Sequence, residues 1–123
     1  MRPERGYVAY LEDIFTAMAA AMRFTHGMTF EAFVADEKTV YATVRALEIM
    51  GEAAKRVPAE IRARYPAIPW RNMAGIRDVV IHEYDRVDRE IVWKTVHSDL
   101  PEVEPEVRRA FEMERQSEGG DAT

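Results

Sequence analysis

Apolar residues near the start of the chain recur at three- and four-residue spacing, which is the period of one face of an α-helix. The pattern covers about residues 4–24, where polar residues fill the intervening positions, and it predicts an amphipathic helix. Gly27 is expected to end this helix, because glycine is a poor helix former. The apolar face consists of Tyr7, Leu11, Ile14, Phe15, Met18, Ala21 and Met22.

The helical spacing continues in the second quarter of the chain, after residues whose side chains favour helix starts. Thr29 can cap a short helix, and Asp36 can cap a second helix over about 36–57, which we expect to be the longest of the chain. Small residues around Gly51 permit another helix to approach its backbone closely. Pro58 should end this helix and open a short one.

The second half of the chain is also predicted to be helical. Two prolines within 65–70 predict an extended connector, and the following helix is expected over about 69–84. Asp88 is the expected cap of a helix that runs through Leu100. A last, more polar helix is predicted over 101–116.

These elements together predict an all-α fold. No alternation of β type is present, and the connections are short, so we expect an antiparallel bundle of four to five main helices. A single domain should cover 1–116. Residues 117–123 are small and polar, and they predict a flexible C-terminal tail.

Composition narrows the functional classes. The chain has 123 residues, of which 47% are hydrophobic, enough for one core without crosslinks. Its lack of cysteine excludes disulfides and thiolate chemistry, and it fits a cytoplasmic protein. No segment is apolar enough for a signal peptide or a membrane span. The net charge of −5 argues against bulk electrostatic binding of nucleic acid, so any RNA contact must be local.

One stretch, 76–84, combines apolar residues with Arg77, Asp78, His82 and Tyr84. On a continuous helix, Asp78 and His82 are four residues apart and can pair, which would orient the ring. Arg77 and His82 would be about 140° apart, too far to close on one phosphate. This geometry indicates that two copies of the stretch could meet across a two-fold axis.

The residue types suit cleavage of RNA without a metal ion. A histidine can take the proton from a 2′-hydroxyl, and an arginine can stabilise charge on the phosphoryl oxygens. Such a reaction leaves a cyclic phosphate and spares DNA. Solvated ion pairs on an exposed helix explain the same spacing, however, and residue types alone leave both readings open. The three histidines show no metal-ligand spacing, and no cofactor is implied.

The order Arg77-Asp78-x3-His82-Glu83-Tyr84 resembles the R-polar-x3-H signature of HEPN domains, in the R-x4-H-x-Y form of the HepT toxin family. Five further blocks resemble that family in the same order, so the likeness extends from about residue 7 to 100. These blocks are Tyr10-Leu11-Glu12-Asp13-Ile14, Phe30-Glu31-Ala32-Phe33, Leu47 to Lys55, Tyr65 to Trp70, and Val87-Asp88-x3-Val92-Trp93.

The resemblance implies a homodimeric HEPN-type bundle that acts as the endoribonuclease toxin of a type VII toxin–antitoxin system. It implies that Arg77 and His82 are the catalytic pair, with Asp78 as the supporting polar residue, where many members have asparagine. It also implies that an MntA-type nucleotidyltransferase antitoxin silences the toxin by attaching AMP to Tyr84. The alternatives are a non-catalytic HEPN module that binds the nucleotidyltransferase or a nucleotide, and a purely structural bundle.

Overall fold

The structure is a computed structural model that describes residues 6–121. Residues 1–5 of the predicted domain and residues 122–123 of the predicted tail lie outside this range. The described part is helical and contains no strand, which confirms the all-α prediction. Its helices are α1 (Tyr7–Phe24), α2 (Phe30–Ala35), α3 (Glu37–Arg56), α4 (Ala59–Arg64), α5 (Trp70–Ala74), α6 (Ile76–Val80), α7 (Arg89–Lys94) and α8 (Leu100–Asp121).

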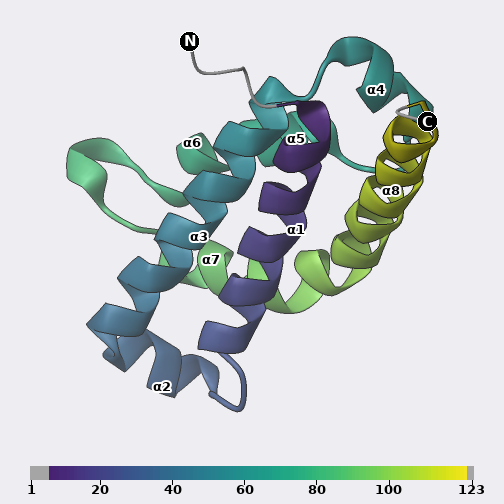
Figure 1. The fold of residues 1–123 in the computed structure, drawn as a ribbon. Coiled ribbons are helices and arrows are strands. Elements are labelled where there is room, and N and C mark those ends of the chain that lie inside the picture. The colour runs from purple at the N-terminus through teal and green to yellow at the C-terminus, as the bar shows by residue number, and fades with distance from the viewer. Residues whose placement is uncertain (1–5, 122–123) are drawn as a thin grey trace, which may run out of the picture.

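The core lies where α1 and α3 run side by side in opposite directions, with α8 packed against α1 (Figure 1). The apolar face predicted for the first helix points inward, as its spacing requires. The core combines the residues of this face that have no exposed surface with fully buried residues of α2 and α3. Fully buried residues include Leu11, Ile14, Met18, Phe33, Val40 and Leu47.

The predicted helix starts are confirmed by side-chain caps. The hydroxyl of Thr29 accepts a hydrogen bond from the backbone N–H of Ala32 at 3.1 Å. The carboxylate of Asp36 accepts one from the N–H of Thr39 at 3.2 Å. Each cap pairs an N–H that has no partner within its own helix.

The predicted close approach at Gly51 is also confirmed, and it fixes the elements that carry the motif. A Cβ atom on Gly51 would lie 2.8 Å from the carbonyl oxygen of Met73 and 3.1 Å from Cγ2 of Ile76. The missing side chain therefore lets α5 and α6 pack directly on α3. This contact sets the position of the segment that follows Ile76.

The predicted helix over 69–84 is wrong in its second half. A turn at Gly75 separates α5 from α6, and α6 ends at Val80. Ile81 is extended, with φ −119° and ψ 122°, and it pairs with Val87 in an isolated antiparallel bridge. The run of β-branched side chains at 79–81 explains the change, because such residues favour extended backbone.

The predicted break between Leu100 and Pro101 is also wrong. A π-helical turn over Thr95–Asp99 joins α7 to α8 without interruption. The nitrogen of Pro101 carries no hydrogen and cannot donate to the preceding turn. The wider π-helical turn removes the need for that hydrogen bond.

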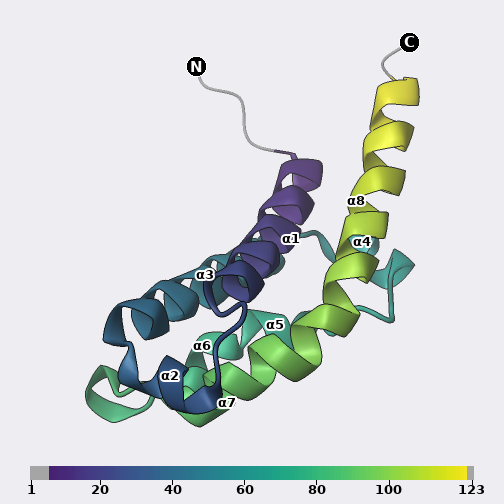
Figure 2. The same ribbon diagram turned by 90° about the horizontal axis from the view of Figure 1, so that it is seen from below.

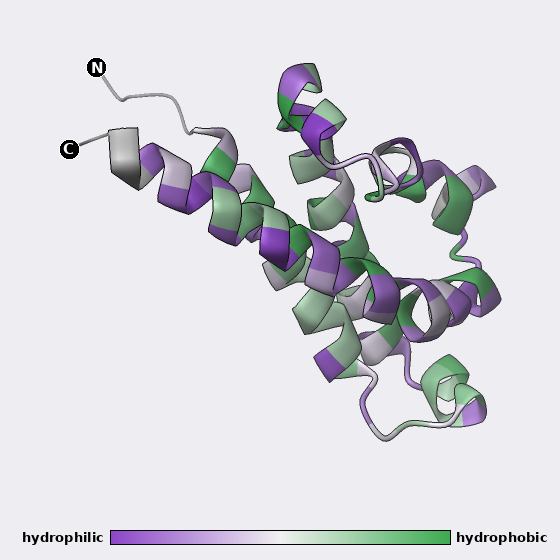
Figure 3. Cartoon of the chain, turned by 90° about the vertical axis from the view of Figure 1, so that its right-hand side faces the viewer, coloured by the Kyte–Doolittle hydropathy of each residue, from purple (hydrophilic) through white to green (hydrophobic). Residues whose placement is uncertain are grey.

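The C-terminal helix α8 has 22 residues against 20 for α3, so the latter is not the longest, contrary to expectation. Hydrophilic and hydrophobic bands alternate along it (Figure 3). It continues through 117–121, beyond the predicted domain end at Gln116, while the flexibility of the tail stays a prediction. Within residues 6–121, no helix is long and apolar enough to cross a membrane.

Candidate active site

The segment between α6 and α7 is a hairpin-like loop that projects from the edge of the bundle (Figures 1 and 2). The N–H of His82 donates to the carbonyl of Arg86 at 2.8 Å, and the N–H of Asp88 donates to the carbonyl of Val80 at 2.7 Å. These bonds hold the two arms of the loop together. His82 and Tyr84 therefore lie on this loop, and not on the helix that carries Arg77.

Tyr84 is at the tip of the loop with an unusual backbone. Its φ of 59° and ψ of 31° lie in the left-handed region. Among the described residues, Tyr84 is the only non-glycine residue with positive φ. Its side chain is 94% exposed. Left-handed backbone at a residue other than glycine lowers the stability of the fold by about 1–2 kcal/mol, and packing of the exposed ring does not compensate for this loss. The loop thus presents the phenol to solvent.

Arg77 is fixed through a residue of another helix. Its Nε donates to Oε2 of Glu48 on α3 at 3.1 Å, and the arginine side chain remains 55% exposed. The adjacent Ile76 is buried against Gly51, so the backbone under the guanidinium is held firmly. A positioned and accessible guanidinium can bind phosphoryl oxygens.

His82 meets a carboxylate that comes from the start of α7. Its Nε2 lies 3.3 Å from Oδ2 of Asp88, and the histidine side chain is 55% exposed. The predicted partner was Asp78, but that pairing required a continuous helix, which ends at Val80. Asp78 is exposed on α6, next to Arg77.

Because the helix does not reach His82, the predicted 140° between Arg77 and His82 is wrong as well. The two side chains belong to separate elements, so their directions are not related by helical rotation. The prediction that two copies of the motif meet therefore loses its geometric basis, and a homodimer stays a prediction.

The exposed face of the loop borders an open groove of about 440 Å³. Its charged side chains are of both signs, which fits a local contact with RNA better than a broad basic surface. The groove is lined by His82, Glu83, Arg86, Val87 and Asp88.

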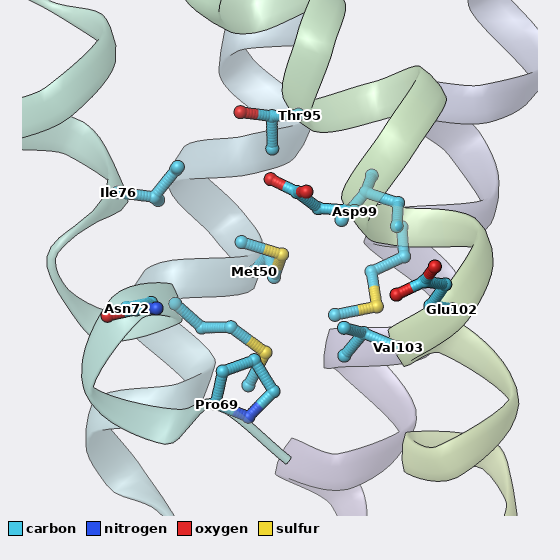
Figure 4. Close-up of a pocket in the computed structure, with 11 residues that line it drawn as sticks. Met50, Pro69, Asn72, Ile76, Thr95, Asp99, Glu102 and Val103 are labelled. Atoms are coloured by element: carbon cyan, nitrogen blue, oxygen red, sulfur yellow. The ribbon is translucent and has the colours of Figure 1, made fainter. Parts of the chain in front are cut away.

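A second cavity, of about 250 Å³, lies between α5 and the beginning of α8 (Figure 4). Methionine side chains line its inner part, and the polar groups at its rim are Asn72, Thr95, Asp99 and Glu102. None of these is cationic, and the two carboxylates repel phosphate. This cavity is therefore a poor candidate for an RNA site.

His97 and the two tryptophans have structural surroundings, whereas His26 is exposed after the end of α1. His97 stacks on Trp93 at 3.7 Å between ring centroids, and its Nδ1 is 3.1 Å from the carbonyl of Trp93. Trp70 is buried, and its Nε1 donates to the carbonyl of Tyr65 at 3.0 Å. No group of three or more histidine, aspartate or glutamate side chains within residues 6–121 is arranged to hold a metal ion.

Two residues of the site were not predicted from sequence, namely Glu48 and Asp88. Both belong to blocks that resemble the HepT family, but Asp88 was given only the role of a helix cap, and Glu48 was given no role. The available signal was the β-branched run at 79–81, which favours an early helix end and so a loop that returns to Asp88. No local pattern indicates the pairing of Glu48 with Arg77, because 29 residues separate them.

Comparison with known proteins identifies the family of the chain. The profile of the family described as Ribonuclease HepT-like matches residues 14–110. "Probable ribonuclease HepT" of Thermococcus cleftensis is 47% identical over 98 residues, covering 80% of this chain and 89% of that protein. A candidate RNase of Methanocaldococcus jannaschii is 40% identical over 107 residues, covering 87% and 92%.

A candidate RNase of Caldanaerobacter subterraneus is 40% identical over 106 residues, covering 86% of this chain and 95% of that protein. No solved structure gives a significant match. The matched range contains α3, α6 and the loop, and therefore every residue of the candidate site. The chain belongs to the HepT-like ribonuclease family.

Proposed function

We propose that this protein is a metal-independent endoribonuclease that cleaves RNA by attack of the 2′-hydroxyl. One observation carries the proposal: the chain belongs to a ribonuclease family, and its two motif side chains are exposed, each beside a carboxylate of another element. An oriented base and an oriented cation are what this reaction requires.

In the proposed reaction, His82 takes the proton of the 2′-hydroxyl as its oxygen attacks the phosphorus. The bond between phosphorus and the 5′-oxygen breaks, and that oxygen receives the proton. Arg77 stabilises the negative charge that develops on the phosphoryl oxygens. The products are a 2′,3′-cyclic phosphate and a 5′-hydroxyl. His82 passes the proton of the 2′-hydroxyl on to the 5′-oxygen, so the scheme balances without a metal ion.

We further propose that the active form is a homodimer. Apolar side chains are exposed on α3, which carries Glu48, and on α6, which packs against α3 and carries Arg77. Such exposed residues are typical of surfaces that meet a partner. They are Tyr41, Ile49 and Val79.

As its biological role, we propose the toxin of a type VII toxin–antitoxin system, silenced by an MntA-type nucleotidyltransferase that attaches AMP to Tyr84. The exposure and left-handed backbone of Tyr84 support this, since a modifying enzyme needs an accessible phenol. The added phosphate would repel RNA from the loop. A cytoplasmic location stays a prediction.

The proposed activity is tested with protein from cell-free synthesis, incubated with RNA in EDTA. We expect cleavage by the unchanged protein and a loss on the order of 100-fold or more in Arg77→Ala and in His82→Ala. Arg109→Ala and His97→Ala are matched controls on other surfaces and should cleave normally. Equal cleavage by His82→Ala and the unchanged protein would contradict the proposal.

The exposed loop also suits the second candidate, a non-catalytic module that binds the nucleotidyltransferase. Co-expression with such an enzyme, followed by intact-mass measurement, separates the two roles. Increments of AMP that disappear in Tyr84→Phe but persist in Tyr41→Phe are expected. Stable binding of the enzyme by a protein that never cuts RNA would favour the module.

A further inference from the structure

One carboxylate, that of Asp88, serves two groups that belong to different elements. Its Oδ1 accepts a hydrogen bond from the backbone N–H of Ile91 at 3.1 Å and thereby caps α7. Its Oδ2 lies 3.3 Å from Nε2 of His82 on the loop. The start of α7 therefore determines which edge of the imidazole faces the protein.

The protonation of this pair follows from its geometry. The N–H of Ile91 and, to a smaller extent, the ring of His82 lower the pKa of Asp88 and outweigh burial, which raises it, so the carboxylate is ionised at neutral pH. An ionised carboxylate only accepts hydrogen bonds. The nitrogen that faces it, Nε2, must therefore carry a hydrogen, and in the neutral ring the lone pair is on Nδ1.

We propose that Asp88 is a positioning residue that holds His82 with its hydrogen on Nε2, which leaves Nδ1 as the nitrogen that exchanges protons with RNA. Nδ1 takes the proton of the 2′-hydroxyl while the bond from this oxygen to phosphorus forms. It returns the proton to the 5′-oxygen as the bond from phosphorus to that oxygen breaks. The catalytic part rests on the proposed ribonuclease activity, whereas the orientation of the ring does not.

The variant Asp88→Asn gives the sharpest test. Asparagine is as good a helix cap as aspartate, and its oxygen must face the N–H of Ile91 to fill that role. Its NH2 group then points at Nε2 of His82. Because two donors cannot pair, the ring has to accept at Nε2 and carry its hydrogen on Nδ1. The lone pair that the reaction needs is lost.

We therefore expect kcat for RNA cleavage to fall on the order of 100-fold in Asp88→Asn, with KM unchanged. Asp88→Ser keeps the cap but cannot reach the ring, and it should lose only about tenfold, since the free ring still samples the correct form. Asp36 caps α3 through the N–H of Thr39, and its other oxygen accepts from the Thr39 hydroxyl where that of Asp88 faces a histidine. Asp36→Asn is thus the matched control and should cleave normally.

A second measurement does not depend on cleavage. The 15N resonances of the His82 ring, recorded without RNA at a pH where the ring is neutral, report which nitrogen carries the hydrogen. We expect Nε2–H in the unchanged protein and Nδ1–H in Asp88→Asn. The same form in both proteins would overturn the proposal, whether or not RNA is cut.

The two measurements separate the possible failures. If Asp88 were only a cap, the aspartate, asparagine and serine proteins would cleave equally, because these residues cap about equally well. A switch of the ring form without any change in kcat, in a protein whose activity requires His82, would also overturn the catalytic part. If the unchanged protein leaves RNA intact, the proposed function fails, and the resonances alone decide whether Asp88 orients the ring.

Discussion

At the scale of single residues, the candidate site consists of two exposed side chains, each beside an acid from elsewhere in the chain. Glu48 contacts Arg77 at 3.1 Å, and Asp88 lies 3.3 Å from His82. Exposed ion pairs contribute little to stability, about 0–1 kcal/mol. The main effect of these two pairs is therefore to orient side chains, because each acid holds the arginine or the histidine in one direction.

Replacement of Tyr84 by glycine is expected to stabilise the protein. Glycine adopts left-handed backbone without strain, and the tyrosine ring is 94% exposed, so little packing is lost. We expect the free energy of unfolding to rise by about 1 kcal/mol, measured by urea denaturation. Tyr41→Gly, within α3, is the control and should destabilise. A clear loss of stability in Tyr84→Gly would show that the ring packs against a surface.

Replacement of Asp78 by asparagine tests the role of the acid in the motif. Its carboxylate is exposed next to Arg77 on α6 and, since α6 ends at Val80, is not held beside His82 by helical spacing. The negative charge should therefore mainly repel the incoming phosphate. We expect Asp78→Asn to lower KM for RNA by up to about fivefold with kcat unchanged. A large fall in kcat would instead assign Asp78 a part in orienting His82.

At the scale of elements, the helices with a strong period were predictable from sequence, as were the caps at Thr29 and Asp36. The errors occurred where local signals conflict with longer-range ones. The sequence around Val80 is equally compatible with a helix that continues past this residue and with a helix that ends there before an extended segment. The loop closes through the bridge between Ile81 and Val87, which a local pattern does not reveal.

The contact of α3 with α5 and α6 predicts the effect of Gly51→Ala. Alanine raises helix propensity by about 1 kcal/mol, but its Cβ would lie 2.8 Å from the carbonyl oxygen of Met73. Since backbone cannot rotate away, α5 has to shift. We expect a net loss of about 1–2 kcal/mol in urea denaturation, together with weaker RNA cleavage.

Gly6→Ala is the control for this substitution, because a Cβ at Gly6 meets nothing within 4 Å. It should leave cleavage unchanged, with a loss of stability limited to the weaker N-cap that alanine provides for α1. If Gly51→Ala is as stable and as active as the unchanged protein, the close approach of α5 does not position Arg77.

At the scale of the whole molecule, one buried carboxylate ties the C-terminal helix to the rest. Glu114 on α8 accepts hydrogen bonds from the hydroxyl of Tyr7 at 3.0 Å, from Arg64 at 2.8 Å and from the hydroxyl of Tyr65 at 2.5 Å. These donors come from α1, from α4 and from the connector after α4. The cluster lies away from the motif, so its role is in the fold.

This cluster predicts how stability depends on pH. Burial raises the pKa of Glu114, but the hydrogen bonds from its three donors outweigh this, and the net pKa is below the ordinary value. The lowered pKa means that its contribution is present above about pH 4.5 and is lost as the pH falls through the folded-state pKa. Burial and the bond to Glu114 raise the pKa of Tyr65 to about 12, so its contribution is lost as the pH rises from about 10 to 12.

Glu114→Gln should therefore lower the free energy of unfolding by about 2 kcal/mol at pH 7 and flatten its dependence on acid. Thermal unfolding followed by circular dichroism between pH 3 and 7 measures both effects. Glu112→Gln, which breaks only the exposed pair with Arg115, is the control. An equally steep acid dependence in Glu114→Gln would contradict the assignment.

The helical fold was thus accessible from sequence, and so were the identities of Arg77, His82, Asp78 and Tyr84 as candidates. Their arrangement was not, because it depends on the loop after Val80 and on acids distant in sequence. The proposed dimer accordingly rests on exposed apolar side chains and not on helical angles. Sedimentation of the purified protein can examine the dimer separately.

The proposed mechanism requires that a 2′-hydroxyl performs the cleavage without a metal ion. The most direct measurement incubates the unmodified protein in EDTA with an RNA oligonucleotide and with its 2′-O-methyl and DNA counterparts, and analyses the products by mass spectrometry. We predict that only the RNA is cut and that the new ends carry 2′,3′-cyclic phosphate. Cleavage of the 2′-O-methyl strand or of DNA, or intact RNA in the presence of folded protein, would contradict the account.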